Sequence, residues 1–167
     1  MTASARSQQS RRLLQFGVVL LLFSALDGFA IPFFASPRIG LSVHTLSGLQ
    51  AVIFLGFGLL WPKLNLGPRA LRVAFWCAVY SALAIVAAYV IAAIWGVGNE
   101  TIKLMGELPH GLSHGSAFQE GLIKVVAYTS APTGLLAFTL ILWGLRTVDP
   151  QRDHAERDRV ERSGRTG

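Results

Sequence analysis

Residues 13–34 read LLQFGVVLLLFSALDGFAIPFF, an apolar stretch in which Asp27 is the single ionisable side chain. A helix rises about 1.5 Å per residue, so roughly 20 residues cross the hydrocarbon core of a bilayer. Three more largely apolar stretches of sufficient length follow at 41–61, 70–95 and 121–145. The sequence therefore predicts an all-α fold, an integral membrane four-helix bundle whose spans are these four segments.

The composition is typical of a single membrane domain. The chain has 167 residues, of which 52% are hydrophobic and 14% charged, and its mean hydropathy is +0.49. Ordinary soluble domains carry about 25% charged residues, so the membrane class is favoured. We expect a cytoplasmic segment at 1–12, a transmembrane domain at 13–146, and a disordered cytoplasmic tail at 147–167. Because Cys77 is the single cysteine, no disulfide forms within the chain.

The basic residues predict the orientation in the membrane. Three lie before the first span, three around the loop between the second and third spans, and six at or after the end of the fourth, out of 15 Lys and Arg. Cytoplasmic loops of membrane proteins are enriched in Lys and Arg, so both termini are expected in the cytoplasm, with a bacterial-type inner membrane as the setting. The basic residues alternate with apolar blocks, which argues against nucleic acid as a partner despite the net charge of +6.

Polar residues gather on the expected outer side of the membrane. Asp27 lies about 10 Å below the outer end of the first span, and an ionisable group at that depth normally faces the protein interior with a partner. Lys124, one turn inside the fourth span, is the best candidate partner. The alternatives are that the pair only locks two helices together, or that Lys124 extends outward to the interface.

His44 opens the second span and is the candidate centre of a site. Ser47 and Gly48 follow on its face, which suits a groove for a flat ligand, although small residues are also typical of close helix packing in membranes. Glu120, beside Gln119, lies where a carboxylate favours a helix N-terminus. If Glu120 also faces His44, the two form a proton donor and acceptor pair.

His110 and His114 fall in the one long loop of the chain. Their spacing brings two imidazoles together only on a helix, and the neighbouring Pro109 and Gly111 argue against one. We therefore predict no metal site, and whether these histidines join the site around His44 stays open.

Short motifs resemble the hydroxylaminobenzene mutase family. They are PRIGLSVH at 37–44, LWPKL at 60–64, QE at 119–120 and WGLR at 143–146. The resemblance implies a membrane-bound isomerase that converts an aryl hydroxylamine to an aminophenol by moving the hydroxyl from nitrogen to a ring carbon. It implies a small aromatic substrate and no redox cofactor. One departure is that TLSG at 45–48 follows His44, where the family carries an acidic residue.

The reaction implied by the resemblance needs an acid, a base and stabilisation of positive charge on the ring. We expect His44 with Glu120 or Asp27 to supply the acid and base. Phe29 and Phe33 are expected to bracket the ring together with two further phenylalanines. The residues expected to bind the substrate are Arg38, Ser47, Gln119, Lys124, Phe34 and Phe118.

Two other functions compete with an isomerase. One is a non-catalytic membrane binding module, such as a quinol- or haem-binding subunit, although haem held between two axial histidines would need a second histidine within a span besides His44. The other is a small transporter subunit, with Asp27 and Lys124 marking an ion path. A homo-oligomer is possible, because Ala84, Ala88 and Ala92 form a small-residue strip on the third span that suits either a dimer interface or packing within the monomer.

Overall fold

The computed structural model describes residues 3–98, 101–102 and 115–146, and within them the chain is helical without strands. The long helices are α1 (Ala3–Ala30), α2 (Pro37–Leu60), α3 (Pro68–Trp95) and α4 (Ala117–Arg146), joined in part by the short 3-10 helices η1 (Ile31–Phe33) and η2 (Trp61–Lys63). All four long helices are long and apolar enough to cross a membrane. The predicted all-α, four-span membrane fold is confirmed, whereas the predictions for His110, His114 and the tail fall outside the described residues.

Proline, glycine and serine set the helix boundaries. Pro37 and Pro68 occupy the first positions of α2 and α3, where proline's missing N–H would have no partner in the helix. Gly96 ends α3 with a φ of 66°, a left-handed conformation that favours glycine. Before α4, Ser116 and Gln119 form a reciprocal capping box, in which each side chain accepts a hydrogen bond from the other residue's backbone N–H, at 3.3 Å and 2.9 Å.

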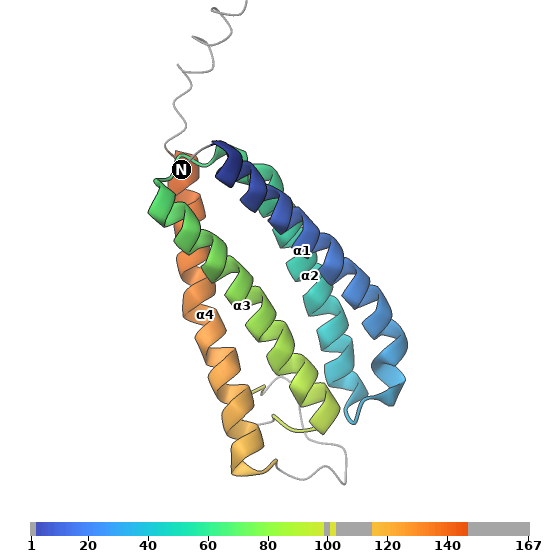
Figure 1. Ribbon diagram of the computed structural model, residues 1–167. Coiled ribbons are helices and arrows are strands. Elements are labelled where there is room, and N and C mark those ends of the chain that lie inside the picture. The colour runs from blue at the N-terminus through green and yellow to red at the C-terminus, as the bar shows by residue number, and fades with distance from the viewer. Residues whose placement is uncertain (1–2, 99–100, 103–114, 147–167) are drawn as a thin grey trace, which may run out of the picture.

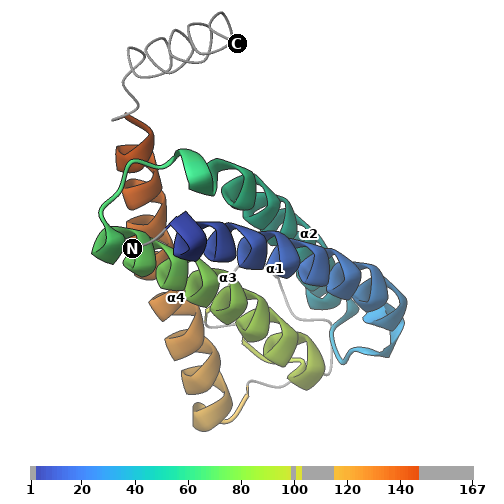
Figure 2. The ribbon, with the colours of Figure 1, turned by 45° about the horizontal axis from the view of Figure 1, so that its top comes forward.

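The helices form two antiparallel pairs, α1 with α2 and α3 with α4, and the pairs meet chiefly where α2 contacts α3 (Figure 1). A rotated view shows the same two pairs (Figure 2). The start of α1 and the end of α4 lie at one end of the molecule, close to η2. The connection between α1 and α2 lies at the opposite end.

Polar contacts hold α1 onto the end of α2. The Trp61 ring is fully buried, and its indole N–H donates a hydrogen bond to Gln9 Oε1 at 3.2 Å. At the next residue of α1, the Ser10 hydroxyl donates to the backbone oxygen of Gly58 at 2.7 Å. These bonds join residues about 50 positions apart and fix the register of the first helix pair.

The second pair is joined in the same way. The Ser81 hydroxyl of α3 donates to the backbone oxygen of Ser130 in α4 at 2.8 Å. This approach needs Gly134, since a Cβ there would lie 2.6 Å from Ser81 Oγ, inside contact distance. Tyr80 and Thr129 add a hydroxyl contact of 2.8 Å.

The alanine strip of α3 packs within the chain. Ala84, Ala88 and Ala92 are 8%, 0% and 0% exposed. The structure therefore shows that this strip packs inside the monomer. It is not a surface for a second copy of the chain.

Candidate active site

His44 lies on α2 and faces α1. Its Nδ1 atom is 2.8 Å from the backbone oxygen of Ser24. Because a carbonyl oxygen only accepts hydrogen bonds, Nδ1 carries the proton of the neutral imidazole. The other ring nitrogen, Nε2, then has a lone pair, with which a histidine acts as a base or a ligand.

Small residues let the imidazole approach α1 closely. A Cβ on Gly28 would lie 3.3 Å from both Cε1 and Nδ1 of His44, so the ring packs directly against the glycine backbone. On the facing helix, a Cβ on Gly48 would lie 3.4 Å from Ser24 Oγ. The Ser24 hydroxyl itself donates to the backbone oxygen of His44 at 2.8 Å.

Sequence reasoning missed Ser24 and Gly28, although a signal for both was present. Residues 24, 27 and 28 are three and four positions apart and share one helical face. A serine and a glycine therefore accompany Asp27 on the face of α1 that meets His44. Applied to the first span, the spacing that singled out Ser47 and Gly48 beneath His44 would have found them.

Asp27 joins this cluster. It is only 5% exposed, and its carboxyl lies close enough to His44 for the two groups to interact electrostatically. Its Oδ2 atom is buried and has no hydrogen-bond partner among the described residues. Buried polar atoms are normally hydrogen-bonded, so this oxygen is an acceptor that no described residue uses.

The expected pair between Asp27 and Lys124 is not formed in the described part of the chain. Lys124 is exposed on α4, which packs on α3, whereas Asp27 faces α2 in the other helix pair. The sequence could not exclude this ion pair, because the depth of a residue within its span does not show which helices pack together.

Glu120 joins α3 to α4. It is 6% exposed, and its Oε1 accepts a hydrogen bond from the backbone N–H of Gly98 at 2.9 Å. Gly98 has a φ of 108°, which aims this N–H in a direction that few other residues allow. No hydrogen bond or ion pair joins Glu120 to His44 within the described residues, because the two belong to different helix pairs.

The residues expected to bind the substrate are not assembled around His44. Ser47 is fully buried and donates to the backbone oxygens of Val43 and His44 at 2.7 and 3.1 Å. Gln119 belongs to the capping box of α4. Phe34 packs over Gly40 and the buried cluster around Ile39. The remaining phenylalanines, Phe29, Phe33 and Phe118, are 81%, 88% and 74% exposed.

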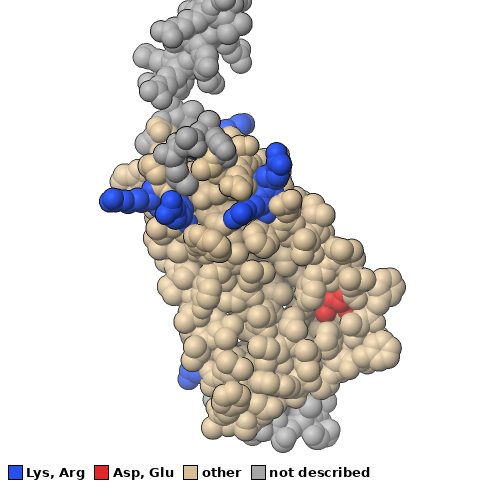
Figure 3. Space-filling view, in the orientation of Figure 1, with Lys and Arg blue, Asp and Glu red and all other residues tan. Residues whose placement is uncertain are grey.

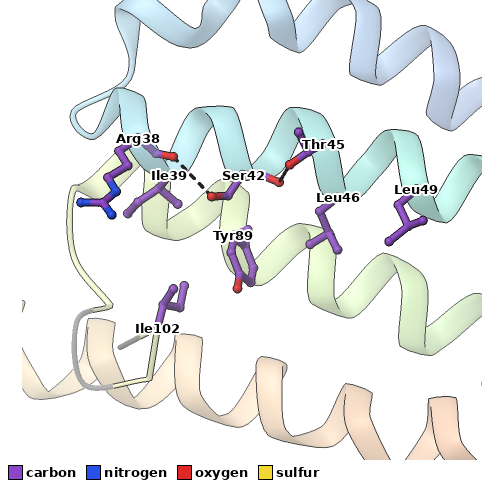
Figure 4. A pocket seen from close by; sticks show the side chains of 8 residues that line it. All are labelled: Arg38, Ile39, Ser42, Thr45, Leu46, Leu49, Tyr89 and Ile102. Carbon is purple, nitrogen blue, oxygen red and sulfur yellow. Dashed lines mark hydrogen bonds between the residues drawn. The ribbon is translucent and has the colours of Figure 1, made fainter. Parts of the chain in front are cut away.

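Arg38 belongs to a pocket between α2 and α3 of about 280 Å³ (Figure 4). Polar and apolar side chains share its lining, which consists of Arg38, Ile39, Ser42, Thr45, Leu46, Leu49, Tyr89 and Ile102. Residues 38, 42, 45 and 49 follow one face of α2, and at 100° per residue His44 points well away from that face. The pocket and the His44 cluster are thus two separate features of the same helix.

A metal site of several protein ligands is not present in 3–98, 101–102 and 115–146, where no three His, Cys, Asp or Glu side chains gather. His44 is the one histidine in these ranges, and because its Nδ1 donates to Ser24, the lone pair of its neutral form lies on Nε2.

Comparisons with known proteins agree with the resemblance noted in the sequence. The chain is 38% identical to hydroxylaminobenzene mutase HabB of Ectopseudomonas oleovorans over 152 residues, 91% of this chain and 90% of that protein. It is 27% identical to hydroxylaminobenzene mutase HabA of the same organism over 130 residues, 77% of this chain and 93% of that protein. No solved structure matches it significantly. The family model for styrene oxide isomerase matches residues 9–146, which include nearly all of the four helices, and the chain therefore belongs to the styrene oxide isomerase family.

Proposed function

We propose that the chain is a membrane-bound isomerase that converts an aryl hydroxylamine to an aminophenol. The observation that carries this proposal is the 38% identity to a hydroxylaminobenzene mutase over 91% of the chain. Mutase and isomerase names among its relatives support an isomerase, and a non-catalytic binding module or transporter is not favoured. The four apolar helices place the enzyme in the lipid bilayer.

The proposed reaction is balanced without a second substrate. The N–O bond breaks and a C–O bond forms at the ortho ring carbon. That carbon loses a proton and the nitrogen gains one, so substrate and product are isomers. The difficult step is N–O cleavage, which leaves positive charge spread over nitrogen and the ring.

We assign the chemistry to the cluster of His44 and Asp27. The lone pair on His44 Nε2 is the base that removes the ortho proton, and the protonated ring then returns it to the substrate nitrogen, which completes the balance. The unpartnered Oδ2 of Asp27 receives a hydrogen bond from the substrate's N–H or O–H group, and the Asp27 carboxyl offsets positive charge as the N–O bond breaks. Glu120 is assigned to structure, because its Oε1 accepts the hydrogen bond that joins the Gly98 backbone to α4; its Oε2, like Oδ2 of Asp27, is buried without a hydrogen-bond partner among the described residues, but Glu120 belongs to the other helix pair from His44.

An aryl epoxide is the second candidate substrate, favoured by the match to the styrene oxide isomerase model. Opening of such an epoxide breaks the C–O bond at the carbon beside the ring, where the hydroxylamine reaction breaks an N–O bond, and leaves positive charge on that benzylic carbon. A hydrogen shift then gives an isomeric aldehyde. The same requirement, stabilisation of charge next to an aromatic ring, applies to both substrates.

The test uses membranes that contain the full chain. Phenylhydroxylamine and styrene oxide are incubated separately, and 2-aminophenol and phenylacetaldehyde are measured by chromatography, with membranes that lack the chain as the control. Prompt formation of 2-aminophenol supports the first substrate, and aldehyde alone supports the second. In water enriched in ¹⁸O, an unlabelled aminophenol supports hydroxyl migration, whereas a labelled one shows that the oxygen comes from solvent. Absence of both products from folded protein overturns the proposal.

We also propose that both termini lie in the cytoplasm of a bacterial-type cell, with the chain in its inner membrane. Lys and Arg gather at the end of the molecule where α1 begins (Figure 3), and seven of the nine in the described residues belong to that end. The positive-inside rule supports this orientation. Green fluorescent protein fused to the carboxyl end should fluoresce, and alkaline phosphatase fused there should be inactive. The reverse pattern would reject the orientation.

A further inference from the structure

Two pockets adjoin each other along the N-terminal half of α1. The first, of about 420 Å³, is polar and lined by Ser7, Gln8, Arg11, Arg12 and Gln15. The second, of about 350 Å³, is mainly apolar and lined by Arg12, Gln15, Phe16, Val19, Phe75 and Trp76. Since Arg12 and Gln15 line both, the two pockets form one continuous surface that changes from cationic to apolar along α1.

The cationic half has no counter-charge among the described residues. Arg11 and Arg12 are exposed and form no hydrogen bond or ion pair there, in contrast to Arg6, which donates to the backbone oxygen of Leu66 at 3.4 Å. The described acids, Asp27 and Glu120, lie toward the other end of α1 and at the start of α4. An anionic group is therefore the complementary ligand for this half.

The apolar half lies on the outward-facing sides of α1 and α3, which are two of the membrane-spanning helices. Val19 and Trp76 are 60% and 58% exposed, and Phe75, only 2% exposed, lies behind them. Phe75 is packed edge-on against Trp76, with ring centroids 5.3 Å apart, and against Trp61 at 6.1 Å. These contacts hold the aromatic wall on α3 in place, so the groove between α1 and α3 can receive a hydrocarbon chain.

We propose that this surface binds an anionic phospholipid, with its phosphate at Arg11 and Arg12 and an acyl chain along Phe16, Val19 and Trp76. Basic pockets between membrane helices on the cytoplasmic side suit anionic head groups, and this end is the cytoplasmic one in the proposed orientation. A free anion would use only the polar half, whereas a lipid uses both. The bound lipid bridges α1 and α3, and thereby joins the two helix pairs at that end.

The charge requirement is tested by native mass spectrometry of the full chain in non-ionic detergent, titrated with phosphatidylglycerol or with phosphatidylcholine of the same acyl chains. The expected result is an adduct with phosphatidylglycerol at concentrations that give none with phosphatidylcholine. A basic residue near a lipid head group contributes about fivefold to binding, so R11Q/R12Q should weaken it about 25-fold. The matched control is R69Q/R72Q, which removes the same charge from exposed positions at the same end outside both pockets.

Equal losses in the two double variants would overturn the proposal, because they would show diffuse attraction to the basic end. Equal binding of the two lipids would also overturn it, as would complete displacement of the lipid by millimolar inorganic phosphate. Thermal unfolding of each variant without lipid confirms that it is folded before binding is compared.

The groove is tested by a second pair of variants. Val19→Trp fills the apolar pocket, whereas Val18→Trp places the same side chain at a neighbouring position of similar exposure, 59%, outside the pocket. Val19→Trp is expected to weaken phosphatidylglycerol binding at least fivefold and to remove the rise in unfolding temperature that the lipid gives. Val18→Trp should change neither quantity. Undiminished binding to folded Val19→Trp would overturn the placement of the acyl chain and with it the proposal.

Discussion

Nδ1 of His44 lies 2.8 Å from the backbone oxygen of Ser24, across the contact between α2 and α1. Since the acceptor is backbone, the choice of tautomer does not depend on the Ser24 side chain. The bond directs the proton to Nδ1 and leaves the lone pair on Nε2, which is the atom that the proposed mechanism uses. The role of each ring nitrogen can therefore be tested separately.

The variant His44→Asn separates them. An asparagine places its amide nitrogen near the position of Nδ1, so the bond to Ser24 can persist, but nothing replaces Nε2. We expect kcat to fall by about 100-fold or more, the usual contribution of a general base, while the unfolding temperature changes little. Activity is measured with phenylhydroxylamine, and circular dichroism follows unfolding. A fully active variant would remove His44 from the mechanism.

Gly28→Ala tests the packing of the imidazole. The new Cβ would lie 3.3 Å from the His44 ring, which must then move by a few tenths of an ångström. Because catalysis is sensitive to such displacements, we expect kcat to fall about threefold to tenfold. The control is Gly56→Ala on α2, where a Cβ meets no atom within 4 Å. It should leave kcat unchanged and stabilise the helix by up to about 1 kcal/mol.

Asp27→Leu is expected to make the protein more stable and inactive. The carboxyl is buried with an unpartnered oxygen, and replacing an unsatisfied buried polar group by an apolar one stabilises a protein by about 1–3 kcal/mol. Thermal unfolding in detergent and turnover of phenylhydroxylamine are measured on the same sample. A variant that loses stability would show that Asp27 holds α1 and α2 together, and retained turnover would remove its catalytic role.

Glu120 is tested by a pair of substitutions. Glu120→Gln keeps an oxygen that accepts from the Gly98 N–H, whereas Glu120→Ala leaves that buried donor unpaired. We expect Glu120→Gln to retain turnover within about twofold, and Glu120→Ala to cost about 1–3 kcal/mol of stability. If Glu120→Gln instead abolishes turnover without unfolding, the carboxyl itself takes part in catalysis.

Ser42→Leu distinguishes the pocket beside Arg38 from the His44 cluster. The larger side chain fills part of the 280 Å³ between α2 and α3 and does not point toward His44. If the reaction takes place at His44, we expect kcat/KM to stay within about threefold of the original, because residues 42 and 44 point to nearly opposite sides of α2. A large rise in KM would place the substrate in this pocket, and it would also support the binding role predicted for Arg38.

The number of spans was predictable from sequence, whereas the pairing of the helices was not. Length and apolarity alone identify a membrane helix, but they do not show which of its faces is buried, because lipid is as apolar as the protein core. Leu20 is 5% exposed and Leu26 is 61% exposed, although both are leucines in the same span. The sequence therefore leaves the neighbour of Asp27 ambiguous. Its depth within the span predicts Lys124 as the partner, whereas the structure places His44 beside it.

The candidate site was predictable to the extent that its residues are polar and rare in membrane spans. Asp27 and His44 stand out for that reason. Ser24 and Gly28 do not, since serine and glycine are frequent in membrane helices for packing. Glu120 lies in the first turn of α4, as its place in the sequence predicts, but the capping bonds there come from Ser116 and Gln119. The Glu120 side chain instead accepts from the Gly98 N–H, a bond that depends on the backbone after α3 and could not be predicted from the sequence.

The hydrogen bonds of His44 and its close approach to Gly28 involve residues of the first two helices alone. Their contacts join positions about 20 residues apart, so they form as soon as α1 and α2 have paired. Contacts of short sequence separation form early, and domains generally assemble from the N-terminus during synthesis. The growing chain can thus complete the surroundings of His44 while the ribosome is still translating α3 and α4.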